Sequence, residues 1–87
     1  MNREKRREPR RRTSGSIRIR FHNPQRVEFE GALVDVSPGG FRTVHDCNTL
    51  ESGSIVEFWH STESGQARVM WNRFNTDGIE SGFLVIS

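Results

Sequence analysis

Short apolar alternations separated by turn-forming residues dominate this 87-residue chain from residue 16 onward. Ile17, Ile19 and Phe21 alternate with polar or charged residues, which is the period of two of a half-buried strand. Six such segments, bounded by Gly, Pro, Asn, Asp or Ser, cover residues 17–22, 27–36, 41–45, 54–60, 66–74 and 79–86. No stretch of ten or more residues has the 3.6-residue period of an amphipathic helix. The pattern predicts an all-β fold of six short strands.

The second segment, 27–36, changes face part-way along its length. Its apolar residues start on Val27, Phe29 and Leu33, at odd positions, but end on Val34 and Val36. A change of face near Gly31 predicts a β-bulge or a strong bend, which a curving sheet needs. Short strands at a spacing of roughly 8–12 residues favour a sandwich or a barrel, and closure into a barrel removes exposed sheet edges. We therefore predict a six-stranded β-barrel.

The first twelve residues carry most of the positive charge of the chain. They hold seven of its thirteen cationic side chains and two carboxylates, a net charge of +5, whereas residues 13–87 sum to −3. All the cations except Lys5 are arginines, whose planar guanidinium binds phosphates and purine edges through paired donors. This asymmetry predicts an anionic ligand. We divide the chain into an Arg-rich arm over residues 1–15, expected to be flexible and to clamp the ligand, and a barrel domain over residues 16–87.

Size and cysteine content favour a binding module over an enzyme. A chain this short buries only roughly 60–65 % of its unfolded surface, which leaves little room for an enclosed catalytic cavity. Cys47 is the only cysteine, so an internal disulfide is excluded and a reducing compartment fits best. No apolar run approaches the ~20 residues of a membrane span, and the arm lacks the apolar stretch of a signal peptide. We predict a cytoplasmic, non-catalytic protein without membrane insertion, metal or cofactor.

Two segments carry side chains suited to a guanine nucleotide, and the first lies in the arm. Arg6 and Arg10 are four residues apart, and Arg7 and Arg11 repeat this spacing one residue later. Pro9 disfavours a helical conformation at the residue before it and lacks a backbone donor. The arm is therefore predicted to be extended or turning and to present two guanidinium groups to a ligand.

The second segment comprises residues 35–40 and is called here the 35–40 segment. Asp35 supplies a carboxylate, Ser37 a hydroxyl group, and Gly39 and Gly40 allow backbone N–H groups to approach a ligand closely. Arginine can donate two hydrogen bonds to O6 and N7 of guanine, and a carboxylate can accept from N1 and N2 on the opposite edge. A ligand that contains both guanine and phosphate would use both segments.

The combined pattern Arg6-x-x-x-Arg10 and Asp35-x-Ser37-x-x-Gly40 resembles that of the PilZ domain, the bacterial receptor for the second messenger cyclic di-GMP. The resemblance extends to residues 69–71 (Val-Met-Trp) and 82–83 (Gly-Phe), and so covers nearly the whole chain. It implies an antiparallel six-stranded barrel against which the arm clamps cyclic di-GMP. Many such domains continue into a C-terminal helix, whereas this sequence predicts little or none.

The resemblance also implies roles for individual residues. Arg6 and Arg10 would bind guanine and phosphate, Asp35 and Ser37 would contact the guanine edge, and Gly40 would allow close approach of the backbone. A proline before the second arginine favours the Arg6/Arg10 register. The remaining candidates are Arg7 and Arg11 in the alternative register, together with Gly39 and Trp71. Ordering of the arm would then act as the switch seen by a downstream protein partner.

Two other functions fit parts of the pattern. One is a PilZ-like protein-interaction module that does not use nucleotide. The other is a nucleic-acid-binding module, which ranks lower because Asp35 would repel phosphate. Trp59 and Trp71 lie in strand-like segments and are predicted to pack mainly in the core, and Met70 is predicted to be a packing residue.

Overall fold

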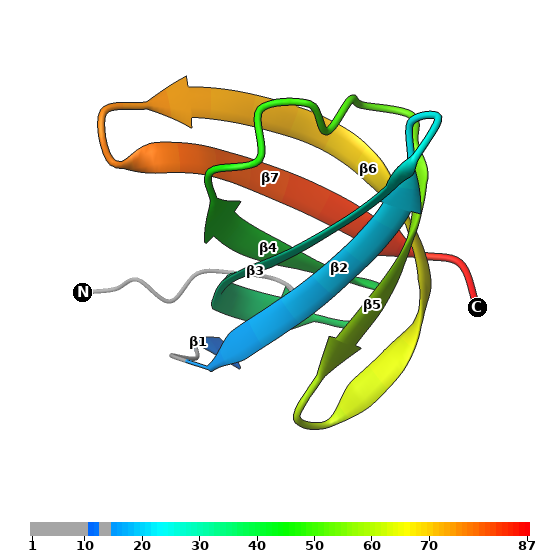
Figure 1. The fold of residues 1–87 in the computed structure, drawn as a ribbon. Helices are drawn as coiled ribbons and strands as arrows, with labels where there is room; N and C mark the ends of the chain where they lie inside the picture. Colours follow the sequence, from blue (N-terminus) through cyan, green and yellow to red (C-terminus); the bar gives the residue numbers. More distant parts are fainter. Residues whose placement is uncertain (1–10, 13–14) are drawn as a thin grey trace.

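The computed structural model describes residues 11–12 and 15–87 of the chain. These residues form seven strands and no helix (Figure 1). The strands are β1 (Arg11–Arg12), β2 (Ser16–His22), β3 (Arg26–Ser37), β4 (Gly40–His45), β5 (Ile55–His60), β6 (Glu63–Asn75) and β7 (Gly78–Val85). The six long strands, β2 to β7, correspond to the six predicted segments, and β6 begins three residues earlier than expected.

The six long strands close into an antiparallel barrel. The order along the sheet is β3-β2-β5-β6-β7-β4, and β4 pairs with β3 to complete the ring. Every pairing is antiparallel. The β6–β7 hairpin projects beyond the barrel, as Figure 1 shows. The predicted antiparallel six-stranded barrel is thus confirmed, and in it β2 and β5 lie opposite β4 and β7.

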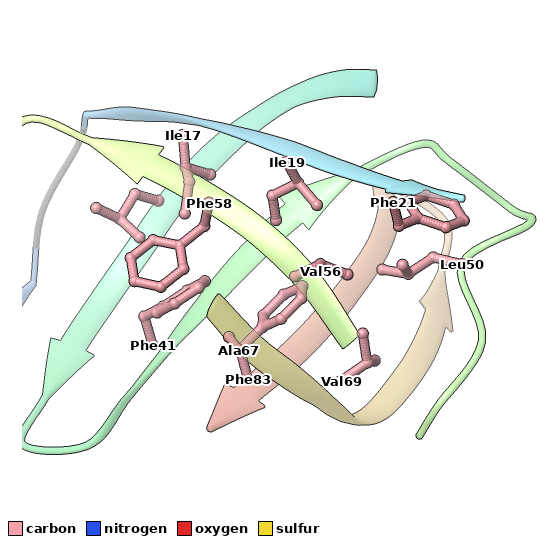
Figure 2. Packing of buried hydrophobic residues seen from close by; sticks show 11 residues of the cluster. Ile17, Ile19, Phe21, Phe41, Leu50, Val56, Phe58, Ala67, Val69 and Phe83 are labelled. Atoms are coloured by element: carbon pink, nitrogen blue, oxygen red, sulfur yellow. The ribbon is translucent and has the colours of Figure 1, made fainter. Parts of the chain in front are cut away.

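The alternating residues of the strands fill the barrel interior. In β2, Ile17, Ile19 and Phe21 are buried and the residues between them face outward. Figure 2 shows their side chains meeting those of the other strands. The ring of Phe41 has its centroid 4.8 Å from the centroids of both Phe58 and Phe83. Aromatic pairs at this separation contribute about 0.5–1.5 kcal/mol each beyond the area that they bury. The interior is therefore a packed apolar core.

The strand β3 contains the predicted bulge, three residues later than expected. The register between β3 and β4 shifts between Leu33 and Asp35, which leaves Val34 as the extra residue. Leu33 pairs with Thr43 on the inner face of the barrel, whereas Asp35 pairs with Arg42 on the outer face. Because side chains alternate with a period of two, Leu33 and Asp35 would share one face without the bulge.

The strand β1 brings the end of the arm to β3. Arg11 pairs with Val36 and Arg12 pairs with Asp35, next to the stretch of β3 that β2 occupies. Residues 1–10 and 13–14 lie outside the described residues, and with them the predicted contacts of Arg6, Arg7 and Arg10.

Packing in the core is a wrong prediction for three side chains, those of Trp59, Met70 and Trp71. Trp71 lines a pocket on the outer face of the barrel. Trp59 is 38 % exposed and Met70 is 49 % exposed, so neither lies in the core. Trp59 faces outward because Val56 and Phe58 take the inward positions of β5. Met70 is the extra residue where the register between β6 and β7 shifts, and a bulged residue is not held to either face.

Candidate ligand-binding site

A pocket of about 240 Å³ lies on the outer face of the barrel, where β3, β4, β7 and β6 meet. Most of the 35–40 segment forms one side of it, and Trp71, Gly82 and Leu84 contribute to the other. The structure therefore brings Asp35, Ser37, Gly39, Gly40 and Trp71 together, five residues that the sequence analysis selects as ligand contacts.

Two bulges turn the polar and aromatic side chains of this pocket outward. The first, at Val34, moves Asp35 to the outer face. The second, at Met70, does the same for Trp71, which pairs with Gly82 of β7. By strict alternation Trp71 would follow Ala67 and Val69 into the core. Bulges redirect side chains in this way near binding sites.

Asp35 is paired with Arg42, a contact that the sequence analysis does not predict. Its side chain is only 4 % exposed, and the Arg42 guanidinium lies across its carboxylate. Nε of Arg42 donates to both carboxylate oxygens, at 3.2 and 3.1 Å, and Nη2 donates to Oδ2. Nη1 of Arg42 donates to Glu80 at 3.1 Å. The hydrogen bond to Asp35 raises the pKa of Arg42 above its usual value, so this side chain stays positively charged.

The register of the β3–β4 hairpin could have identified Arg42. Pro38 and Gly39 form a two-residue turn, so Ser37 pairs with Gly40. Counting back two pairs from the turn places Arg42 opposite Asp35.

The β3–β4 turn and the neighbouring strand β7 explain the two glycines of this hairpin. Gly39 has a φ of +85°, and a Cβ on Gly40 would lie 2.6 Å from the Phe83 carbonyl oxygen. The close approach of β7 thus requires Gly40 independently of any ligand.

Trp71 lies directly over Gly82. A Cβ at Gly82 would lie 2.4 Å from the indole ring, so only glycine leaves room for it. The guanidinium of Arg73 lies over the ring, 5.4 Å from its centroid, and is 3.8 Å from Glu80. These contacts connect Trp71 through Arg73 and Glu80 to Arg42, and of these four residues Trp71 and Arg42 line the pocket.

A second pocket, of about 470 Å³, lies between β3, β4 and the neighbouring turns. Its lining includes Glu30, Asp46 and Asp77, and no lysine or arginine among the described residues. Although it is larger, its negative charge makes it a poor site for a phosphate-containing ligand.

His45 belongs to a buried hydrogen-bond chain inside the barrel. The backbone N–H of Cys47 donates to Nδ1 of His45 at 3.0 Å, so the ring proton is on Nε2, which donates to Ser81 Oγ at 2.8 Å. Ser81 Oγ in turn donates to Asn72 Oδ1 at 2.5 Å. Burial lowers the pKa of His45, and the nearby Asp46 opposes this in part. These polar groups satisfy each other and are structural.

Other kinds of site find no support among residues 11–12 and 15–87. In this part of the chain no group of three or more His, Cys, Asp or Glu side chains could hold a metal ion. The same residues include no helix that is long and apolar enough to cross a membrane.

Comparisons with known proteins identify a family and a similar solved structure. The family model of the PilZ domain matches residues 4–85. The structure is similar to that of the Bacillus subtilis inhibitor of motility (MotI/DgrA), with a TM-score of 0.73 at 13 % sequence identity. That alignment covers all of this chain and 44 % of the other chain, so this chain spans less than half the length of the protein that it matches. No curated protein matches the sequence.

Proposed function

Because this chain belongs to the PilZ domain family, which binds cyclic di-GMP, we propose that it is a non-catalytic receptor for that dinucleotide. The arm and the 35–40 segment form the two sides of the site. Arg6 and Arg10 bind guanine and phosphate, with Arg7 and Arg11 as the alternative register. Asp35 and Ser37 contact the guanine edge, and Gly39, Gly40 and Trp71 line the pocket beside it.

The observation that carries this proposal is the pairing of β1 with β3. Arg11 and Arg12 lie opposite Val36 and Asp35, so the backbone leads the arm to the 35–40 segment. Arg10 directly precedes Arg11 in the sequence, and we expect it to reach the same pocket.

The size of the pocket is consistent with a ligand that is held between the barrel and the arm. At about 240 Å³ it is smaller than the roughly 300–1,000 Å³ of pockets that enclose a drug-sized ligand. One base fits such a volume, whereas a cyclic dinucleotide needs a second surface. The arm, with a net charge of +5 over residues 1–12, supplies that surface and neutralises the phosphates. Fixing the arm against the barrel would change the surface that a partner protein contacts.

Calorimetric titration with cyclic di-GMP tests the proposal, with GTP and single-stranded RNA as controls. Specific binding of cyclic di-GMP is expected, and Arg10→Ala should weaken it by about 1.5–3 kcal/mol, which is roughly tenfold or more. Arg6→Ala should have a similar effect, and Asp35→Ala should also lose binding. Arg26→Ala is the matched control, because Arg26 is an exposed arginine at the start of β3 outside the pocket lining.

Two results would contradict the proposal. Equal weak binding of all three ligands, with a steep dependence on salt, would instead indicate a nonspecific electrostatic tether for nucleic acid. The absence of any heat or chemical-shift change with cyclic di-GMP would favour a protein-interaction module that does not use nucleotide.

A further inference from the structure

The carboxylate that should bind guanine is occupied by a side chain of the protein itself. Arg42 contacts both oxygens of Asp35, through Nε at 3.2 and 3.1 Å and through Nη2. With only 4 % of the Asp35 side chain exposed, a ligand reaches this carboxylate only if a neighbouring group moves. Arg42 is the neighbour best placed to move, because its own side chain is 34 % exposed.

The chemistry of the Arg42 contact matches that of the guanine edge. A guanidinium presents an N–H and an NH₂ group bonded to the same carbon, and these donors fit the two oxygens of a carboxylate. Guanine has the same arrangement, since N1–H and the N2 amino group flank its C2 carbon. Both groups therefore need the same lone pairs of Asp35. On the basis of the proposed function, we infer that Arg42 is an internal mimic of the guanine edge, which occupies Asp35 until the ligand displaces it.

Glu80 is an alternative ion-pair partner for the displaced Arg42 side chain. Nη1 of Arg42 already donates to Glu80 at 3.1 Å, so Arg42 keeps one charged partner when it leaves Asp35. Because the Glu80 side chain is only 16 % exposed, keeping this pair avoids leaving a poorly hydrated charge without a partner, which would be costly. Because Arg42 itself lines the pocket, its guanidinium can then meet a ligand phosphate.

This arrangement sets a requirement on the ligand. A base displaces Arg42 efficiently only if it supplies two donors to Asp35 in return. Guanine does so, whereas the corresponding edge of adenine presents an acceptor at N1. Arg42 therefore makes entry to the pocket depend on the donor pattern of the base, and it lowers the affinity for the correct ligand by competing with it.

Arg42→Lys separates this competition from simple charge attraction. Lysine keeps the positive charge but has no planar pair of donors, so it holds Asp35 less well. Calorimetry should show cyclic di-GMP binding about threefold to tenfold more tightly to Arg42→Lys than to the wild type, the scale of one net hydrogen bond. Arg20→Lys is the matched control, because Arg20 makes the same kind of contact to Glu57 on the opposite side of the barrel. Its affinity should match that of the wild type within about twofold.

A second measurement uses only the wild-type protein, so it does not depend on whether a variant folds. In the ¹⁵N–¹H spectrum of the wild type, the Nε–H resonance of Arg42 should shift or exchange faster when cyclic di-GMP saturates the protein. Equal or weaker binding by Arg42→Lys, or a resonance that stays unchanged at saturation, would overturn the inference while leaving the receptor function intact. If cyclic di-GMP binds neither the wild type nor either variant, the receptor function fails and this inference fails with it.

Discussion

Opposite walls of the barrel bury different kinds of side chain. In the site wall, formed by β3, β4, β6 and β7, four polar or charged residues are buried, namely Asp35, Thr43, His45 and Ser81. In the far wall, formed by β2 and β5, the buried residues are all apolar, namely Ile17, Ile19, Phe21, Val56 and Phe58. Buried polar groups are costly unless they are hydrogen-bonded, and of these four only Asp35 lines the pocket on the outer face. The far wall serves as scaffold, and the site wall carries the chemistry.

The two walls contain the same kinds of side-chain pair, but the pairs differ in their exposure to solvent. Each has an arginine paired with a carboxylate and an arginine over a tryptophan ring. In the site wall the carboxylate is Asp35, whose side chain is 4 % exposed, and in the far wall it is Glu57, at 42 %. An exposed ion pair is worth about 0–1 kcal/mol, whereas loss of one partner from a buried pair costs about 3–5 kcal/mol. Burial, and not the presence of a pair, should decide which wall is sensitive to mutation.

The largest expected difference between the walls comes from removing each arginine in turn. Arg42→Met keeps the apolar stem but leaves Asp35 without its Arg42 partner. We expect the free energy of unfolding to fall by about 3 kcal/mol, the lower end of the range for buried pairs, because Arg42 itself is partly exposed. Urea denaturation measures this change. Arg20→Met should lower the free energy of unfolding by no more than about 1 kcal/mol. Equal losses in the two variants would show that burial of the carboxylate is not the deciding factor.

The same contrast explains how much of the fold the sequence could predict. The far wall follows strict alternation, and the segment 17–22 could be assigned to a strand with its inner face known. Alternation also predicts that Trp59 faces outward, once Val56 and Phe58 are taken as inward residues. The prediction for Trp59 is wrong because position along the strand, and not the apolar character of a side chain, decides which face it occupies. Where a strand has no bulge, periodicity is sufficient to assign its inner and outer faces.

In the site wall, periodicity fails because each of two strands contains an extra residue. The bulge in β3 could be predicted from the change of apolar face, although its position at Val34 depends on pairing with β4. The bulge at Met70 gives no comparable signal, since the segment 69–71 is apolar throughout. The motif residues of the 35–40 segment could be selected from the sequence, but the partner of Asp35 emerges only from the register. The local sequence does not show which side chains lie opposite each other on neighbouring strands.

A smaller effect should come from His45, which has no buried counterpart in the far wall. Burial lowers its pKa in the folded protein below the value of 6.5 that applies when it is unfolded. The unfolded chain therefore binds more protons just below that pH, and the stability of the fold decreases as the pH falls through it. The dependence is limited to about 1.4 kcal/mol per pH unit for one group. The nearby Asp46 attracts the proton and limits the loss.

The variant His45→Gln tests this assignment by comparison with the wild type. Thermal or urea unfolding between about pH 8 and pH 5 should show the wild type losing stability relative to the variant as the pH decreases. The variant will have a lower stability at high pH, since glutamine does not reproduce the geometry of the bonds to Ser81 and Cys47. Parallel curves for the two proteins over the whole range would assign the acid sensitivity to other groups.

The smallest effect is expected for the exposed pair of the far wall. Glu57→Gln removes the charge that Arg20 contacts at Nε over 2.8 Å, but Arg20 remains over the Trp59 ring, 5.0 Å from its centroid. The free energy of unfolding should fall by at most about 1 kcal/mol at low salt. Because the pair is exposed, this difference should vanish near 1 M salt, where the screening length is about 3 Å. The loss in Arg42→Met should persist at the same salt concentration, since water and ions reach Asp35 poorly. A salt-resistant effect of Glu57→Gln would mean that the far wall, too, depends on its surface charges, and the contrast between the walls would then rest on the buried polar residues alone.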